Sequence, residues 1–365
     1  IIMSTSQKRK ISALDDGVDL HQLNCVEQYT IGWICALPIE SAAAAKLLDE
    51  KHFEIPNVPE DNNSYRFGRI GGHNVVIGCL PAGRTGLVST AIVAQQMKQS
   101  FGNLRLSLMV GIGGAVPSTE NDIRLGDVVV SQPHGRYGGV VQYDLGKTRP
   151  DGEIERTGSL SSPPEAVLTA LSKLQTTQEM EELRMQKHLE QLSALMPRYS
   201  FPSKLDDNLY RPDQRHKIGA ECSSCGPDGL VERGIRADES PVIHYGTIAS
   251  GNQVMKDGVA RDRISRELGG VLCFEMEAAA LMNNFPCLIV RGISDYSDSH
   301  KNDGWQRYAA AVAAAFAKEL LMHLTVTQVA GTQTISEAMA GVSQRIAQNT
   351  ETARRTEQKI DRTSE

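Results

Sequence analysis

The sequence lacks both an excess of basic charge and a long apolar run, and these absences exclude whole classes of protein. Lys and Arg number 38 against 44 Asp and Glu, so the formal net charge is −6. A chain of this charge has no overall electrostatic footprint for nucleic acid. No stretch approaches the roughly 20 apolar residues of a membrane helix, and no signal-type apolar segment follows the basic N-terminal residues. We therefore expect a cytoplasmic or nuclear protein that binds neither nucleic acid nor a membrane.

Cysteine is too sparse for a disulfide framework. Seven cysteines, an odd number, are scattered along 365 residues, which favours reduced thiols. The one close pair is Cys222 and Cys225, with His216 a short distance upstream. A C-x-x-C pair can be half of a zinc site, but a full site needs four ligands and no second pair is visible. We expect two reduced cysteines in a loop and no metal, with zinc as the less favoured alternative.

Nucleotide-cofactor motifs are also absent. Gly83-x-x-Gly86 and Gly111-x-Gly113-Gly114 match neither a Walker loop nor a full dinucleotide fingerprint, so we expect no cofactor. Such glycines do allow close backbone approach to a ligand, and exposed N–H groups can hold an anion or a ribose oxygen. Taken alone, each segment is more often just a tight turn.

What is present is a long α/β pattern. Hydrophobic residues make up 40% and charged residues 22%, as in ordinary globular proteins. Short apolar runs alternate with helix-forming stretches from Tyr29 to Leu324, which predicts a three-layer α/β domain.

Changes of composition predict three divisions of the chain. Residues 1–28 are polar and we expect a disordered leader; residues 29–326 form the α/β domain, and residues 327–365 form a polar helical linker or tail. Within the domain, residues from about 150 to 215 contain prolines and a charged amphipathic stretch. We interpret this segment as an insertion of one or two helices.

Two acidic residues stand in an apolar setting in FEMEAAALM, where Glu275 and Glu277 flank Met276. Burying a carboxylate is costly unless it is hydrogen-bonded. A vicinal diol can satisfy it, because a carboxylate accepts two hydroxyl hydrogen bonds from a ribose. The alternative is a helix N-terminus, whose dipole favours acidic residues.

The segment LIVRGISDYSD places Arg291, Ser294 and Asp295 at the end of an apolar strand. In α/β proteins this is where sites are found. Asp295 can serve as a general acid if partial burial or a nearby carboxylate raises its pKa. A Ser-Asp pair at a strand end is also typical of a helix cap.

The order of these segments resembles a known family. IGWICALPIESAAA, VGIGGAV, LGDVVVS, HYGTIASG, FEMEAAA and VRGISDYSD are similar to the purine nucleoside phosphorylase and methylthioadenosine/adenosylhomocysteine nucleosidase superfamily. More narrowly, the chain resembles nucleoside phosphorylase-like domains at the N-terminus of fungal NACHT- or ankyrin-type receptor proteins. The resemblance covers residues 29–324. It implies a mixed central sheet, partly closed into a barrel and flanked by helices, in a protein that forms a homo-oligomer.

The resemblance also implies roles for particular residues. Glu40 matches the glutamate that activates water in the nucleosidase branch. Glu277 matches the carboxylate that binds the ribose diol, with Met276 beside the sugar, and Asp295 matches the general acid at purine N7. Further positions match the binding surroundings: Arg291 and Ser294 as supporting partners, Gly83, Arg84, Gly86, Gly113 and Gly114 in loops on the ribosyl or phosphate side, and Val254, Met255 and Lys256 near the base or 5′ end. Glu275, beside Met276, is a further candidate substrate-binding residue.

The nucleophile decides between hydrolysis and phosphorolysis. Glu40 favours water, because a nucleosidase needs a carboxylate to orient and deprotonate it. Arg84 points the other way, since a cation can hold free phosphate or the phosphate chain of a nucleotide. Val254 replaces the family's purine-stacking aromatic residue, and Lys256 is a candidate for a 5′-phosphate.

We therefore expect a purine nucleosidase whose small-molecule partner is a nucleoside or a nucleotide such as ATP. One alternative is a phosphate-dependent purine nucleoside phosphorylase. Another is a non-catalytic nucleoside-sensing module that signals to a downstream domain of a larger receptor-type protein.

Overall fold

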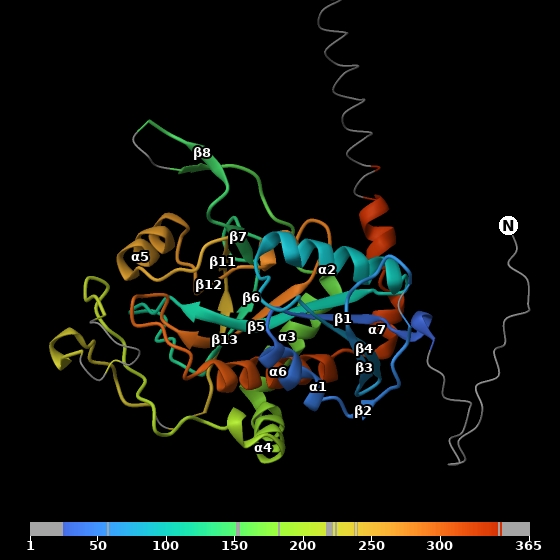
Figure 1. Ribbon diagram of the computed structural model, residues 1–365, viewed down its shortest axis with the longest axis horizontal. Helices are drawn as coiled ribbons and strands as arrows, with labels where there is room; N and C mark the ends of the chain where they lie inside the picture. The colour runs from blue at the N-terminus through green and yellow to red at the C-terminus, as the bar shows by residue number, and fades with distance from the viewer. Residues whose placement is uncertain are drawn as a thin grey trace, which may run out of the picture.

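A computed structural model describes residues 25–56, 58–150, 154–181, 183–216, 222, 225–236, 238, 240–341 and 344. Its main element is a mixed sheet with helices on both faces (Figure 1). The strand order is β10-β6-β13-β5-β1-β4-β3-β2. In that order the strands are Ile243–Gly246, Val128–Ser131, Leu288–Asp295, Leu106–Ala115, Ile31–Cys35, His73–Cys79, Tyr65–Ile70 and Glu50–Lys51.

The middle of the sheet is parallel. β1 pairs in parallel with β4 and β5, and β13 pairs in parallel with β5. Every residue of β1 and of β13 is buried, as expected of parallel strands with both faces covered. The carboxyl ends of β1, β5 and β13 consequently meet at one edge of the sheet.

The sheet branches at the carboxyl end of β5. Gly114 and Ala115 pair antiparallel with β12 (Cys273–Glu275), which pairs with β11 (Ile248–Ser250), and β11 pairs with β7 (Val140–Gln142). The expectation of a mixed α/β fold is therefore confirmed. The pairings among the described residues do not show a closed barrel, so partial closure stays a prediction.

Two apolar layers hold the helices to the sheet. Trp33 packs in one layer and its neighbour Ile34 in the other, because successive side chains of a strand point to opposite faces. Figure 1 shows α2 (Leu87–Ser100) on one side and α1 (Pro38–Lys46) with α6 (Gln306–His323) on the other. Helix α6 lies directly on β13, because α6 has small alanine side chains and β13 has Gly292 where they meet. A Cβ at Gly292 would lie 1.8 Å from the carbonyl oxygen of Ala309.

The segment expected to be an insertion contains two helices, α3 (Glu165–Met180) and α4 (Met185–Leu195). Their apolar residues, such as Leu174 and Leu192, are buried in the layer that α6 also occupies. A small hairpin, β8 (Gly146–Thr148) with β9 (Ile154–Arg156), lies at the start of this segment. Further along the chain, α5 (Gly258–Glu267) precedes β12.

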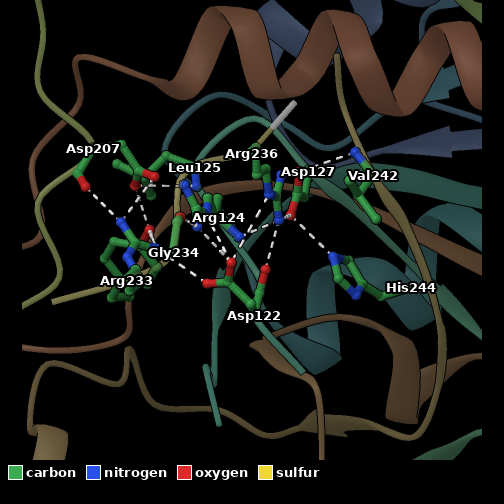
Figure 2. Close-up of polar contacts among 11 residues, drawn as sticks. Asp122, Arg124, Leu125, Asp127, Asp207, Arg233, Gly234, Arg236, Val242 and His244 are labelled. Atoms are coloured by element: carbon green, nitrogen blue, oxygen red, sulfur yellow. Dashed lines mark hydrogen bonds and ion pairs between the residues drawn. The ribbon is translucent and has the colours of Figure 1, made fainter. Parts of the chain in front are cut away.

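A network of ion pairs and hydrogen bonds connects the segment between this insertion and β10 to the residues just before β6 (Figure 2). Asp127, just before β6, accepts hydrogen bonds from Arg236 at 2.6 and 2.7 Å, from the backbone N–H of Val242 at 3.0 Å, and contacts His244 at 2.9 Å. We call the whole set the surface network, because all its members except the buried Asp127 are at least partly exposed: Asp122, Arg124, Asp127, Asp207, Arg233, Arg236 and His244.

The packed structure continues past the boundary expected at residue 326. Val329 in α7 (Val326–Gly331) and Ile335 are buried, and the Ile335 N–H donates to Leu104. Residues 1–24 of the expected leader, and residues 342, 343 and 345–365 of the expected tail, lie outside the described residues. In the described part of the chain, no single helix is long and apolar enough to cross a membrane.

Candidate functional site

A pocket of about 190 Å³ lies where the carboxyl ends of β1, β5 and β13 meet. This is the edge at which α/β folds bind ligands. Each element brings part of its lining: Glu40 from the start of α1, Asp295 from the end of β13, and Glu277 from the turn after β12. The predicted site residues that line the pocket are Glu40, Gly113, Gly114, Val254, Met255, Glu275, Met276, Glu277, Arg291, Ser294 and Asp295.

A buried guanidinium lies among three buried carboxylates. Arg291 is 1% exposed and contacts Glu275, and its Nη2 is 3.3 Å from Oε2 of Glu277. Glu40 belongs to the same charge cluster. Its charge acts to raise the pKa of Glu277, and the charge of Arg291 acts to lower the pKa of Glu40. We call these four residues the pocket cluster. It formally has three negative charges and one positive charge.

Burial dominates the protonation of the pocket cluster. It raises the pKa of Glu277 to about 7, and the charges of Glu275 and Glu40 add to the rise while Arg291 opposes it. Burial also raises the pKa of Glu40, against Arg291 and three backbone N–H groups. Carboxyl groups with a raised pKa can take up and release protons near neutral pH.

Glu40 is held in place by the backbone. It is the third residue of α1, and its side chain turns back to accept hydrogen bonds from the N–H groups of Ala36 at 2.7 Å and Leu37 at 2.9 Å. Its other oxygen accepts from the N–H of Ile112 at 2.9 Å. The carboxylate is therefore fixed at the pocket wall, as a positioned base must be.

Glu275 and Glu277 differ in how fully they are satisfied. Glu275 accepts from the N–H groups of Glu277 and Ala278, at 2.9 to 3.1 Å, and from Arg291. Glu277 has longer contacts, 3.2 Å to the N–H of Gly86 and 3.3 Å to Arg291. Glu275 thus positions the turn and the guanidinium, whereas Glu277 keeps acceptor capacity for a ligand.

The glycines of β5 leave room for these acids. A Cβ at Gly111 would lie 2.6 Å from Oε1 of Glu40, and one at Gly114 would lie 2.5 Å from Oδ1 of Asp295. Sequence reasoning expected these glycines to admit a ligand. The structure shows instead that the absence of a side chain at Gly111 and Gly114 makes room for the carboxylates of Glu40 and Asp295.

Asp295 has three polar partners. Its carboxylate accepts from the N–H of Ser297 at 3.0 Å, from the hydroxyl of Ser294 at 2.9 Å, and from Nζ of Lys301. Ser297 has a left-handed backbone, with φ 52°, a conformation that is costly outside glycine and is found at functional sites. Lys301 was missed by sequence reasoning; the available signal was its place six residues after Asp295, in the loop that follows β13.

The remaining predicted residues lie outside the lining. Gly86 is adjacent to it through its bond to Glu277, whereas Gly83, Arg84 and Lys256 are exposed and do not line the pocket. Their neighbours Thr85 and Met255 do line it. Other lining residues that sequence reasoning missed are Ala36, Leu37, Ile112, Gln253, Phe274, Ser297, Lys301 and Gln306.

Comparison with known proteins agrees with this architecture. The family model of the Phosphorylase superfamily matches residues 30–324. A nucleotide-binding leucine-rich repeat (NLR)-like protein of Hyaloscypha variabilis is 47% identical over 302 residues, which are 81% of this chain and 29% of that protein. The chain thus spans less than a third of that relative.

More distant relatives are named as nucleosidases. A 5′-methylthioadenosine/S-adenosylhomocysteine nucleosidase of Mycobacterium bovis is 26% identical over 81% of this chain and 97% of its own length, and ATP nucleosidase Cap17 of Escherichia coli is 24% identical over 80% and 50%. The structure of the nucleosidase from Neisseria meningitidis superposes with a TM-score of 0.53 at 16% identity, covering 81% of this chain and all of that one. On the match over residues 30–324, this chain belongs to the Phosphorylase superfamily.

Proposed function

We propose that the protein is a purine nucleosidase that cleaves the N-glycosidic bond with water as the nucleophile. The observation that carries the proposal is the convergence of Glu40, Glu277 and Asp295 on one pocket. Relatives named as nucleosidases support the same class of reaction.

Cleavage of this bond develops positive charge on the ribosyl ring and negative charge on the departing base. Stabilisation must therefore act in the transition state, with a proton for the base and negative charge near the sugar. Asp295 in its protonated form gives its proton to the base, and the ammonium of Lys301, which contacts this carboxyl group, stabilises the carboxylate that the transfer leaves. The ammonium of Lys301 and the hydroxyl of Ser294 keep this carboxyl in one orientation.

Glu277 binds the ribose hydroxyls in this mechanism. Its raised pKa follows from burial without full satisfaction, and two sugar hydroxyls would supply the missing donors. Met276 lies beside it in the lining and provides an apolar contact for the sugar ring.

Glu40 orients the attacking water and removes its proton. A catalytic base works best with a pKa near the working pH, and burial moves the pKa of Glu40 in that direction. The three backbone N–H groups occupy three of the roughly four lone-pair sites of the carboxylate, and the remaining site on Oε1 can accept the proton of the water.

The alternative is a phosphorylase, which requires cations for a bound phosphate. The two cations of the described pocket lining, Arg291 and Lys301, are both ion-paired to carboxylates. This favours water. A phosphate would have to draw on Arg84 or Lys256, which are exposed outside the lining but adjacent to the lining residues Thr85 and Met255.

The same two exposed cations support a phosphorylated substrate such as ATP, which is the substrate named for the relative Cap17. The cations would then hold the phosphate chain while the purine riboside occupies the pocket. A role as the nucleoside-sensing part of a longer receptor-type protein is compatible with turnover, and the NLR-like relative supports it. We also propose a homo-oligomer, which light scattering would test.

The decisive experiment incubates the protein with adenosine, inosine, guanosine, methylthioadenosine and ATP, each with and without phosphate. Chromatography then measures free base and the sugar product. Base release without phosphate, giving free ribose or ribose 5′-phosphates, is expected. Release only with phosphate, with ribose 1-phosphate accumulating, would establish the phosphorylase, and no release from any substrate would favour the non-catalytic sensor.

A further inference from the structure

A second group of chemistry-bearing side chains lies outside the pocket, in the loop that follows the helical insertion. Nδ1 of His216 is 3.6 Å from Sγ of Cys222 and 3.3 Å from Sγ of Cys225. Ligand atoms of all three residues lie within 4.8 Å of one another, and all three side chains are half-buried. Two thiols and an imidazole at such spacing are the donor set that zinc prefers.

The spacing matches tetrahedral coordination. Bonds of about 2.3 Å from zinc to sulfur and about 2.0 Å to nitrogen, at the tetrahedral angle, separate the two ligand atoms by about 3.5 Å. The two observed sulfur–nitrogen distances lie on either side of this value. One ion can therefore contact all three atoms with little movement of the side chains.

An imidazole from a distant segment lies beside this group and can become the fourth ligand by a side-chain movement, since its ring nitrogens are not among the atoms that lie within 4.8 Å of one another. His300 is 8% exposed, and among the described residues neither of its ring nitrogens has a hydrogen-bond partner. Its ring stands edge-on to that of His216, with 5.4 Å between centroids, and stacks on Tyr210 at 3.8 Å. A buried imidazole without a hydrogen bond is costly, and a metal ion would satisfy it.

The surroundings of His300 also suit a metal ligand. Its Nδ1 is 3.7 Å from a carboxylate oxygen of Asp298. Zinc-bound histidines commonly direct their second nitrogen at such a carboxylate, which fixes the ring and its tautomer. A neighbouring pocket of about 650 Å³, lined in part by Cys222, Tyr210 and His300, gives an ion a path of entry.

We propose that His216, Cys222, Cys225 and His300 form a structural zinc site. The proposal does not depend on the nucleosidase activity. The sequence showed only the C-x-x-C pair and one nearby histidine, because the fourth ligand is 75 residues beyond Cys225 and only the fold brings it there.

The site would join the end of the insertion to the loop that follows the proposed acid at the end of β13. The N–H of His216 already donates to the hydroxyl of Ser299 at 2.9 Å. His300 immediately precedes Lys301, which is ion-paired with Asp295. Zinc at this place would anchor the loop from both sides, and four protein ligands would leave no open position for catalysis.

The test uses the full chain, expressed with added zinc and freed of loosely bound metal by gel filtration. Mass spectrometry of the metal content should find about one zinc ion per chain, as a closed four-ligand site predicts. Replacement by Co²⁺ should give the visible absorption of a tetrahedral complex together with near-ultraviolet thiolate-to-cobalt charge transfer. Cys25→Ser, at an exposed cysteine outside the cluster, is the matched control and should keep both signals.

The ligand variants define the site. Cys222→Ser with Cys225→Ser should abolish the thiolate charge-transfer band, and His300→Ala should change the cobalt spectrum. Loss of a residue that only hydrogen-bonds to a zinc ligand weakens metal binding about 10–100-fold. Because His300 is proposed as a ligand itself, its replacement should weaken zinc binding by more than this. Circular dichroism checks that each variant is folded.

Three results would overturn the proposal. The first is wild-type protein without zinc and without a tetrahedral cobalt spectrum, which needs no variant to be interpretable. The second is a Cys222–Cys225 disulfide in protein purified under reducing conditions. The third is a double-serine variant that binds zinc as wild type does. Unchanged metal binding in the His300 variant would contradict the fourth ligand.

Discussion

The pocket cluster and the surface network are both built from carboxylates and guanidinium groups, yet they are balanced differently. In the pocket cluster Glu40, Glu275 and Glu277 surround the single guanidinium of Arg291. In the surface network three aspartates face three arginines and one histidine (Figure 2). Among the described residues, each aspartate of the surface network is ion-paired with an arginine. The pocket cluster, in contrast, has more negative charge than its one guanidinium neutralises.

The pKa shifts follow this difference. Burial acts to raise the pKa of Asp127, but the hydrogen bonds from Arg236 and His244 outweigh it and the pKa is lowered. At Glu277 burial also acts first, and one shared guanidinium does not offset it, so the pKa rises to about 7. A balanced cluster stabilises the fold, and an unbalanced buried one indicates a ligand that completes it.

The largest expected effect comes from Asp295→Asn, which removes the proposed proton donor from the pocket. General acid–base catalysis contributes about 10²–10⁴-fold, so kcat of the folded variant for base release should fall by that factor, and circular dichroism measures how much of the protein is folded. Asp228→Asn, at an exposed aspartate outside both clusters, is the matched control and should leave kcat unchanged. A variant with near-normal kcat would remove Asp295 from the mechanism.

Glu277→Gln tests whether the unsatisfied carboxylate is completed by the sugar. A hydrogen bond to a charged group contributes about 1.5–3 kcal/mol, so kcat/KM should fall about 10- to 100-fold more on ribosides than on 2′-deoxyribosides. Glu275, which the protein itself satisfies, offers no such selectivity. Equal losses on both sugars would contradict the diol role.

Asp127→Asn probes the other cluster. Weakening the charge-assisted bonds from Arg236 should lower the free energy of unfolding by about 1.5–3 kcal/mol. Because the surface network does not line the pocket, kcat of the folded variant should stay close to wild type. Chemical denaturation and steady-state kinetics on the same preparation measure both quantities, and a large loss of kcat without loss of stability would reverse the assigned roles.

The sequence predicted the alternation of strands and helices, and the helices of the insertion, because apolar periodicity is a local signal. The membership in the superfamily is confirmed. The sequence also singled out Glu40, Glu277 and Asp295, which now line one pocket. The contact of Glu40 with the N–H of Ile112, 72 residues away, depends on the order of β1, β5 and β13, which periodicity does not show.

The same limit explains what sequence reasoning missed. Lys301 lies in a polar loop where nothing distinguishes an ion-paired lysine from a solvated one, and its partner is known only from the fold. Arg84 and Lys256 were expected in the pocket because they lie in matching loops, yet their side chains are exposed outside its lining. Loop membership predicts the backbone neighbourhood, but the direction of a long side chain depends on local packing.

The smallest expected effect is a difference in stability with pH, and it compares the two clusters most directly. Glu277 has a folded pKa of about 7 against an ordinary value of 4.5, so the folded state holds a proton that the unfolded state has lost. This contribution to stability is fully present below about pH 4.5 and is lost as pH rises through about 7.

Glu277→Gln stays neutral, so without ligand it should be more stable relative to wild type at pH 8 than at pH 5, by on the order of 1 kcal/mol. Asp127 has the opposite sign: its pKa is lowered, so its contribution is present above the unfolded value and is lost as pH falls through the folded one. The penalty of Asp127→Asn should therefore shrink in acid. Denaturant unfolding of both variants and wild type at pH 3, 5 and 8 measures this, and parallel pH profiles for the two variants would show that the clusters are electrostatically alike.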